Sequence, residues 1–497
     1  MSKNKVPIQL QGGVNEVDPR LSLPPGSLDN ALNIECKENA RGYRRIKGYQ
    51  KFDSSVVPGE GDVLGVWYYN DKCYAIRNAV GGVTASMYES SGGGWTAKKT
   101  GLSPNGSYEF YDYYFESELR MFGVSGVHNA FEWDGTTWTD ILTGFSPSDT
   151  PEHLVARKGR LWMSKGEEAA WSDVAAGANE YRNFTGWQGT NGGLALKSQI
   201  TGFQIVPGGD LLITARNQHA YISATGTAAV PFAPTDMNEQ GIETGAIAKT
   251  IQRIGPLTIA FDDRGVISIT DTDTYGNFND ATLSYALRDT LELKKDQVTT
   301  SCIVRSKSQY RLFFSDGSGL IFSFARNELI GITPIEFTDP VKCVVSKEDS
   351  NGDEIILFGS TDGFIYQMEQ GNSFDGENIR SFARVAYTNL GVNYDKFLHK
   401  VVLEFSTSGV VNLQIKVNCI DSEGRILETD WVDVVIANGN ALGPGAILGQ
   451  TLLGPGNPAP NHVMIDGVGE YFLMTFLAEA NDEEPWEINQ IIWEISQ

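Results

Sequence analysis

Residues 65–76 read GVWYYNDKCYAI. An alternating hydrophobic strand, a tight polar turn at Asn70-Asp71 and a second alternating strand are typical of a β-hairpin. The same pattern recurs six more times in different residues, in segments 111–122, 153–164, 203–214, 257–270, 302–314 and 343–358. The seven turns lie about 41 to 55 residues apart, which overlaps the repeat length of β-propeller blades.

Several repeats contain a second hairpin, with turns at Gly92-Gly93, Asp134-Gly135 and near Arg326-Asn327. Two hairpins make a four-stranded antiparallel blade, which buries both of its faces only if neighbouring blades stack and the ring closes. We therefore predict an all-β chain with a β-propeller of six or seven blades over residues 55–378. A series of β-sandwiches is the alternative, but the regular spacing favours the propeller.

Residues 379–497 have a different character, with longer strands of clean alternation such as VVNLQIKVNCID. They predict a separate antiparallel β-sandwich. Between its strands lies an uncharged loop, 437–460, that contains Leu-Gly-Pro-Gly twice. Because loops of this length are usually functional, we expect it to bury apolar side chains against another subunit; the alternative is a loop folded back on its own domain. The side chains in question are Ile447, Leu448 and Leu452.

The third region is an N-terminal arm, residues 1–54, that several prolines keep from forming a long helix. Residues 1–50 carry eight basic and five acidic side chains, a net charge of +3, which leaves −26 for the rest of the chain. A basic, mostly extended arm beside an acidic body is expected to dock on that body, in the same subunit or in a neighbouring one.

The composition excludes several classes of function. The 497 residues hold 39 Lys and Arg against 62 Asp and Glu, a formal net charge of −23. This balance argues against a surface that clamps nucleic acid and against docking on anionic membranes. No apolar stretch is long enough to span a membrane, and the first residues lack the apolar core of a signal peptide. The five widely spaced cysteines fit buried reduced thiols better than disulfides or a zinc site.

Motifs for catalysis or cofactor binding are missing from the sequence. It contains no P-loop, HExxH or GxSxG motif, and its five histidines are isolated. Two acidic loops, beginning at Asp349 and Asp271, match only part of the calcium-binding EF-hand pattern and are interpreted as turns. We therefore predict no catalytic, cofactor-binding or metal-binding residues and no enzyme activity.

The beginning of the chain resembles the tail nozzle, or tail hub, proteins of short-tailed bacteriophages, also called tail tubular protein B or packaged-DNA stabilisation protein. The resemblance lies in Gly12-Gly13, Asp18-Pro19, Pro25-Gly26, a polar segment around Asn30–Asn33, and an arginine pair before a glycine. Glycine and proline at these places favour turns that lead an arm around a surface, and Arg44 and Arg45 suit ion pairs with carboxylates. The alternative is an arm that only covers an edge strand of the propeller.

The resemblance implies a structural protein of the virion tail, made in the cytoplasm of the host bacterium. Such proteins form a homohexamer below the tail adaptor and portal rings, retain the packaged DNA and conduct it during ejection. Tail fibre or tail needle proteins are further expected partners, and DNA is expected to pass without specific binding, as an acidic lumen would allow. The residues assigned to subunit or adaptor contacts are Gly12, Gly13, Asp18, Pro25, Arg44, Arg45, Ile447, Leu448 and Leu452.

Two other functions stay open from the sequence. One is a propeller-fold protein of a virion that binds or cleaves glycans, with carboxylates and tryptophans in one pocket. The other is a scaffold propeller that binds peptides on one face. The tryptophans follow the repeats, so most are expected in blade cores rather than on sugar-binding surfaces; they are Trp67, Trp95, Trp133, Trp138, Trp162, Trp171 and Trp187.

Overall fold

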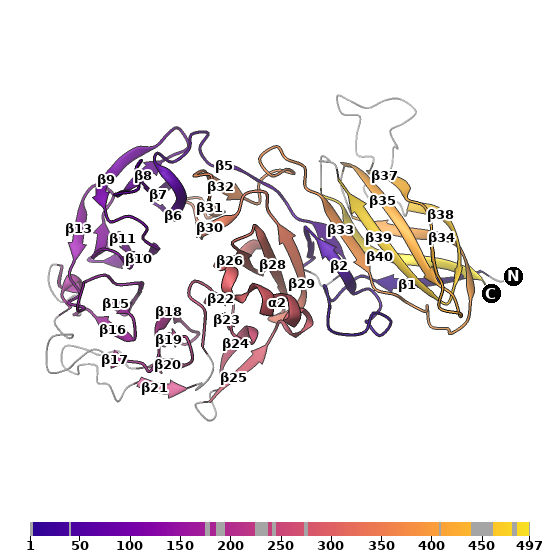
Figure 1. Cartoon of the computed structure of the whole chain (residues 1–497), viewed down its shortest axis with the longest axis horizontal. Coiled ribbons are helices and arrows are strands. Elements are labelled where there is room, and N and C mark those ends of the chain that lie inside the picture. The colour runs from indigo at the N-terminus through magenta and orange to yellow at the C-terminus, as the bar shows by residue number, and fades with distance from the viewer. Residues whose placement is uncertain are drawn as a thin grey trace.

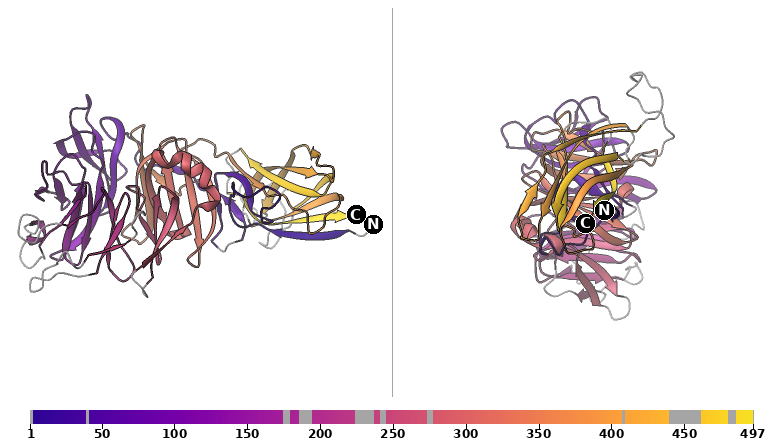
Figure 2. Two further views of the ribbon diagram at one scale, coloured as in Figure 1. Left: turned by 60° about the horizontal axis from the view of Figure 1, so that its bottom comes forward. Right: turned by 90° about the vertical axis from the view of Figure 1, so that its right-hand side faces the viewer.

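The chain folds into a ring of small antiparallel sheets and a β-sandwich that lies beside the ring (Figures 1 and 2). The computed structural model describes residues 3–38, 41–173, 179–184, 194–223, 237–240, 245–272, 277–406, 409–438, 461–479 and 485–496. The ring contains seven four-stranded sheets and the sandwich two six-stranded sheets. The predicted all-β fold with a propeller is therefore confirmed, and the propeller has seven blades.

The seven blades follow one another along the chain, and the first strand of each lies nearest the centre of the ring. Blades one to three are β6–β9 (Glu60–Tyr69, Lys72–Asn78, Ala85–Ser90, Thr96–Leu102), β10–β13 (Glu109–Phe115, Glu118–Val124, Ala130–Trp133, Trp138–Ile141) and β14–β17 (His153–Arg157, Arg160–Lys165, Glu168–Trp171, Leu194–Ala195). Blades four to six are β18–β21 (Ile200–Ile205, Leu211–Ala215, His219–Ile222, Met237–Gln240), β22–β25 (Gln252–Ile254, Leu257–Asp262, Gly265–Thr272, Asn277–Thr282) and β26–β29 (Val298–Val304, Gln309–Phe314, Ser318–Ala325, Glu328–Glu336).

The seventh blade closes the ring with a strand from the other end of the propeller sequence. Its first three strands are β30 (Val341–Glu348), β31 (Glu354–Ser360) and β32 (Ile365–Met368), and its outer strand is β5 (Tyr49–Lys51). The register pairs Met368 with Tyr49 and Tyr366 with Lys51. Because β5 precedes the first blade in the sequence, it ties the two ends of the propeller together and leaves no open end.

The predicted hairpins join the first and second strands in six of the seven blades. In blades one to four the turn has positive φ at two successive residues, for example 49° at Asn70 and 57° at Asp71, as tight hairpin turns require. In blades six and seven the turn has one residue with positive φ, Ser308 and Gly352 respectively. In blade five the predicted turn at 263–264 joins the second and third strands instead. The first strand, β22, has only three residues, too few for an alternating pattern to show in the sequence.

The sandwich is built from both ends of the chain. The C-terminal region contributes β33 (Ser381–Val385), β34 (Lys396–Phe405), β35 (Gly409–Ile420), β36 (Ile426–Glu428), β37 (Val432–Asn438), β38 (Asn461–Gly469), β39 (Tyr471–Ala478) and β40 (Glu487–Ser496). The N-terminal region contributes β1 (Asn4–Gln9), β2 (Leu28–Leu32), β3 (Ile34–Cys36) and β4 (Tyr43–Arg45). One sheet has the order β3-β4-β40-β34-β38 with β1 beside β40, and the other has β2-β33-β39-β35-β36 with β37 beside β35.

The N-terminal region is therefore part of the fold and not a separate arm. β1 pairs antiparallel with the last strand, Asn4 opposite Ile495, so the two ends of the chain lie side by side (Figure 1). The N-terminal segment crosses from the sandwich to the propeller, where β5 is the outer strand of blade seven. Of the two expectations for the arm, docking occurs within its own subunit.

One apolar core joins the propeller to the sandwich. Buried side chains of blades five and six, such as Phe261 and Phe322, share a cluster with sandwich residues such as Val411. The N-terminal residues Val14 and Ile34 belong to the same cluster. Burial of a continuous apolar surface favours one fixed arrangement of the two parts over independent motion.

Candidate functional site: a buried ionic joint and the propeller channel

The predicted Gly12-Gly13 motif lies where the N-terminal segment crosses the outer strand of blade six. Gly13 has a φ of +68°, and a Cβ added to it would lie 2.3 Å from the backbone nitrogen of Ile332. The next residue, Val14, donates its backbone N–H to the Ile332 carbonyl at 2.8 Å. Glycine is required at position 13 because both the backbone conformation and the close contact exclude a side chain.

The Pro25-Gly26 motif serves a second close contact. A Cβ added to Gly26, whose φ is +91°, would lie 1.9 Å from the carbonyl oxygen of Gln9. Gly12, Asp18 and Pro25 are exposed, and the Asn15 side-chain amide donates to the Asp18 carboxylate at 2.8 Å. These three predicted contact residues are therefore accessible on the surface of this chain.

The predicted arginine pair is used within the chain. Arg44 donates to Glu35 at 2.6 Å and to Glu38 at 2.5 Å. Arg45 is completely buried, and its backbone N–H donates to the Trp486 carbonyl at 3.0 Å. Arg44 therefore finds its carboxylate partners within the same subunit, with 18% of its side chain exposed, and Arg45 is buried there.

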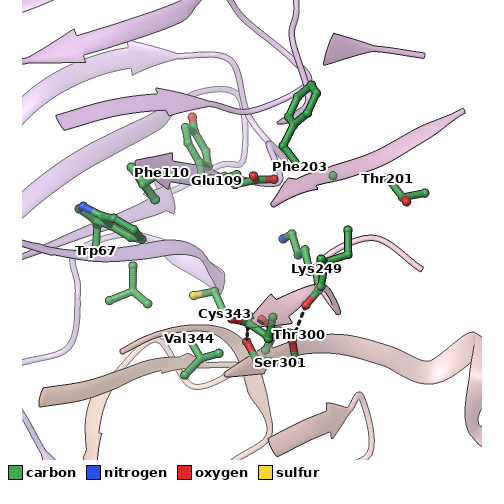
Figure 3. A pocket seen from close by; sticks show the side chains of 15 residues that line it. Trp67, Glu109, Phe110, Thr201, Phe203, Lys249, Thr300, Ser301, Cys343 and Val344 are labelled. Carbon is green, nitrogen blue, oxygen red and sulfur yellow. Dashed lines mark hydrogen bonds between the residues drawn. The ribbon is translucent and has the colours of Figure 1, made fainter. Parts of the chain in front are cut away.

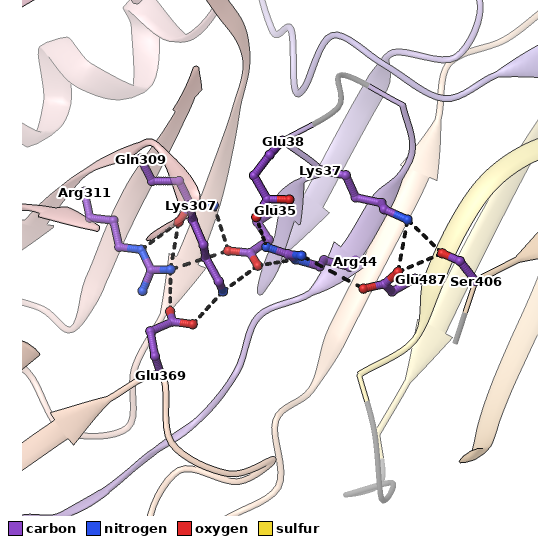
Figure 4. A network of polar contacts seen from close by, with 10 residues as sticks. All are labelled: Glu35, Lys37, Glu38, Arg44, Lys307, Gln309, Arg311, Glu369, Ser406 and Glu487. Carbon is purple, nitrogen blue, oxygen red and sulfur yellow. Dashed lines mark hydrogen bonds and ion pairs between the residues drawn. The ribbon is translucent and has the colours of Figure 1, made fainter. Parts of the chain in front are cut away.

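Glu35 is the centre of a buried ionic cluster that joins the sandwich to blade six (Figure 4). Lys307 donates to Glu35 Oε1 at 2.6 Å, and the side-chain amide of Gln309 donates to Oε2 at 2.8 Å. Burial alone would raise the pKa of Glu35, but the neighbouring cations Lys307, Arg44 and Arg311 lower it to about 2. The carboxylate is therefore ionised at neutral pH.

A second carboxylate completes this cluster from blade seven. Glu369, which directly follows β32, accepts a hydrogen bond from Arg311 and forms an ion pair with Lys307, each at 2.5 Å. The two cations thus lie between Glu35 of the N-terminal segment and Glu369 of the propeller (Figure 4). We call Glu35, Arg44, Lys307, Arg311 and Glu369 the ionic joint. Charges buried in this way are tolerated only because each has opposite charges and hydrogen bonds around it.

Sequence reasoning missed the acidic centre of this joint. The one local signal is a carboxylate between Ile34 and Cys36 in a short strand, which suggests burial of a charge but not its partners. Lys307 and Arg311 follow Glu35 by more than 270 positions, so only the fold brings them together. Three of the predicted contact residues, Ile447, Leu448 and Leu452, lie outside the described residues.

The first strands of the blades line a cavity of about 160 Å³ in the propeller channel (Figure 3). Its wall combines aromatic residues, Phe110 and Phe203 among them, with the polar residues Glu109, Thr201 and Thr300. One cationic side chain, Lys249, reaches into it from the loop before β22. The cavity is thus lined by both polar and aromatic residues.

Trp67, at the edge of this cavity, packs against side chains of both neighbouring blades. Its ring stacks on Phe110 with centroids 5.7 Å apart, and the Lys347 ammonium lies 4.4 Å from its centroid. Its indole N–H donates to Asp112, which Lys347 also contacts at 2.7 Å. A ring packed in this way serves the contacts between blades and is not a platform for stacking a sugar.

The sequence predicts no metal site, no disulfide and no membrane span, and the structure can be compared with these predictions only over the described residues. Within them, no group of three or more metal-ligating side chains is placed to hold a metal ion. The Asp349 carboxylate accepts backbone N–H groups of Asn351 and Asp353, each at 2.9 Å, as a turn residue does. All five cysteines are buried and form no disulfide. Among the helices of the described chain, none is long and apolar enough to cross a membrane.

No protein-family model matches the chain, and no curated protein matches it. Solved structures similar to it include the WD40 domain of Toxoplasma gondii coronin, which is 12% identical with a TM-score of 0.45; the match covers 68% of this chain and 87% of that one. The RRP9 WD40 repeats are 10% identical with a TM-score of 0.44, over 65% of this chain and 99% of that one. PorZ, a surface component of the type-IX secretion system of Porphyromonas gingivalis, is 12% identical with a TM-score of 0.45, over 77% and 56%. At these values the similarity carries no inference about function.

Proposed function

We propose that this chain is a structural protein of a bacteriophage tail, a nozzle subunit that extends the channel below the tail adaptor. The observation that carries the proposal is that the residues of the nozzle-like N-terminal motif build the connection between propeller and sandwich. Gly13 and Gly26 allow the close backbone crossings, and Arg44 belongs to the ionic joint. A subunit of a ring that resists the pressure of packaged DNA needs such a rigid connection between its parts.

An exposed apolar edge of the sandwich supports assembly with further copies. β38 ends one sheet, β36 and β37 lie beside β35 in the other, and β36 contacts β38. Exposed apolar side chains gather on these strands and beside them, which is unusual for a monomer and typical of an interface. We call this surface the sandwich edge; it comprises Ile426, Leu427, Trp431, Val435, Met464 and Val468.

The charge of the chain is compatible with a DNA conduit. A net charge of −23 would line a tube with repulsive potential, so that DNA passes without sites at which phosphates bind. The self-assembled homohexamer, the adaptor ring and fibre or needle proteins are the proposed partners, and the virion tail is the proposed location. The glycan-related alternative receives less support, because Trp67 is occupied and Trp133, Trp162 and Trp171 are buried.

The decisive experiment is cryo-electron microscopy of virions that contain this chain, together with the purified protein. We expect a six-fold ring of this chain at the tail, coaxial with the portal. Virions that lack the chain in their tail, or a purified protein that stays monomeric in the presence of the tail adaptor, would overturn the proposal. A deletion of residues 1–51 would not test assembly, because that segment supplies five strands of the fold itself.

A further inference from the structure

Two strands form opposite edges of one sheet of the sandwich. β40 pairs with β34 on one side and with β1 on the other, and β34 in turn pairs with β38. Within the described chain, neither β1 nor β38 pairs with a further strand on its outer side. β1 and β38 therefore lie on opposite sides of the β34–β40 pair, where a neighbouring copy can approach each of them separately (Figure 1).

The sandwich edge at β38 is surrounded by negative charge. Arg425 pairs with Asp421 at 2.7 Å, and Lys416 pairs with Glu428. Asp466 forms no ion pair within the described residues. An exposed apolar surface with an acidic rim complements a partner surface that combines apolar and basic side chains. The exposed carboxylates on these strands and beside them are Glu423, Glu428, Asp430, Asp433 and Asp466.

β1 carries the opposite charge. Val6 and Ile8 are half-buried and pack against the core. Because side chains alternate along a strand, Lys5 and Pro7 lie on the outer face of the sheet. Lys5 is exposed and forms no ion pair within the described residues, and Lys3, just before the strand, is 56% exposed. We call Lys3, Lys5 and Pro7 the β1 edge; it presents basic side chains beside an apolar ring.

β38 presents its charge on the same face of the sheet. Val463 and Ile465 are buried in the core, so Asp466 lies on the outer face. Lys5 of one copy and Asp466 of another therefore face the same way when two such sheets meet edge to edge. Pro7 has no N–H group, so the contact relies on side chains and not on a complete ladder of backbone hydrogen bonds.

We propose that the sandwich edge of one copy binds the β1 edge of the next copy, with Asp466 facing Lys5 and the other carboxylates facing Lys3. The contact joins two different surfaces, and a head-to-tail contact of this kind generates a ring when the rotation between copies closes. The inference rests on the proposed tail function and deepens it, because it names the two surfaces that hold neighbouring subunits together.

Cysteine cross-linking of the full-length protein, assembled with the tail adaptor, tests this contact. Under mild oxidation the variant Lys5→Cys/Asp466→Cys should form covalent species from the dimer up to the complete ring, since the five native cysteines are buried. A mixture of the two single variants should stop at dimers. The control is Lys5→Cys/Asp140→Cys, with the second change at an exposed position of blade two, and it should run as a monomer on a denaturing gel.

Reversing the charges gives an independent measurement. Lys5→Glu and Asp466→Lys should each weaken association about fivefold, as expected for loss of an exposed ion pair, and the double reversal should restore most of the affinity. Additive losses in the double reversal overturn the contact, as do covalent dimers of Asp466→Cys alone. A six-fold ring in which the double cysteine variant gives no cross-link also overturns it and leaves the proposed tail function in place. A protein that stays monomeric with the adaptor overturns both.

Discussion

Glu35 of the N-terminal segment and Lys307 of blade six form a buried ion pair, with Nζ 2.6 Å from Oε1, although 272 positions separate them in the sequence. Arg44 and Arg311 approach the same carboxylate from the sandwich and from the propeller. The pair therefore lies at the contact between the two parts of the molecule. It makes the stability of each part depend on the presence of the other.

Replacing Glu35 by glutamine should strongly destabilise the protein. Removing one partner of a buried ion pair costs about 3–5 kcal/mol, because the remaining cations lose their counter-ion. Urea unfolding followed by tryptophan fluorescence measures the change. The matched control is Glu38→Gln, which removes a partner of the same Arg44 at a side chain 39% exposed and should cost about 1 kcal/mol or less. Equal losses for the two variants would contradict a central role for Glu35.

The ionic joint should also make stability depend on pH in the acid range. The pKa of Glu35 is about 2 in the folded protein and about 4.3 in an unfolded chain. Its contribution is therefore complete above the unfolded value and is lost as the pH falls towards 2. Urea midpoints measured between pH 5.5 and pH 2.5 should fall more steeply for the native protein than for Glu35→Gln. Parallel curves would show that Glu35 does not contribute.

Gly13→Ala should be much more harmful than Gly61→Ala. Both glycines have a similar positive φ, +68° and +71°, so both alanines are strained alike. A Cβ at position 13 would meet the backbone of Ile332, whereas one at position 61 would meet nothing within 4 Å. The difference in free energy of unfolding should be about 1–3 kcal/mol, the usual cost of overpacking. A difference near zero would mean that the crossing over blade six relaxes easily.

Tyr49→Ala should weaken the pairing of β5 with β32 in the seventh blade. Tyr49 is fully buried, its ring stacks on Phe374 with centroids 4.8 Å apart, and its hydroxyl donates to Asp339 at 2.8 Å. Loss of a buried aromatic ring costs about 3–5 kcal/mol, and hydrogen exchange in β32 should rise with it. Tyr49→Phe keeps the ring and should cost about 1 kcal/mol. If exchange in β32 stays at the native level in Tyr49→Ala, β5 does not secure the ring.

Met464→Glu should block assembly without unfolding the subunit. Met464 is 71% exposed on the sandwich edge, so the change should alter monomer stability by about 0.5 kcal/mol or less while placing a charge in the proposed contact. Analytical ultracentrifugation of the assembled ring gives the measurement. Val83→Glu, at a residue 76% exposed in blade one, is the control and should assemble normally. Assembly of both variants would exclude the sandwich edge as a contact.

Local patterns in the sequence were sufficient for the repeated part of the fold. Alternating strands and turn residues such as Asn70-Asp71 predict each hairpin, because hairpin pairing is short-range and its turn needs residues that tolerate positive φ. The C-terminal sandwich was recognisable for the same reason. In blade five the predicted hairpin joins the second and third strands instead of the first and second, because β22 is too short to carry a pattern.

Only the tertiary structure decided what the N-terminal region does. Its glycines and arginines were recognisable as a motif, and an extended arm docked on its own or a neighbouring subunit was the interpretation of it. The fold instead uses β1–β4 in the sandwich, β5 in the propeller, and Arg44 with Glu35 in the ionic joint. Sequence determines which segments become strands, but pairing across hundreds of residues depends on which surfaces remain to be buried after the local hairpins form. For that reason the partners of Glu35 became visible only in the folded chain.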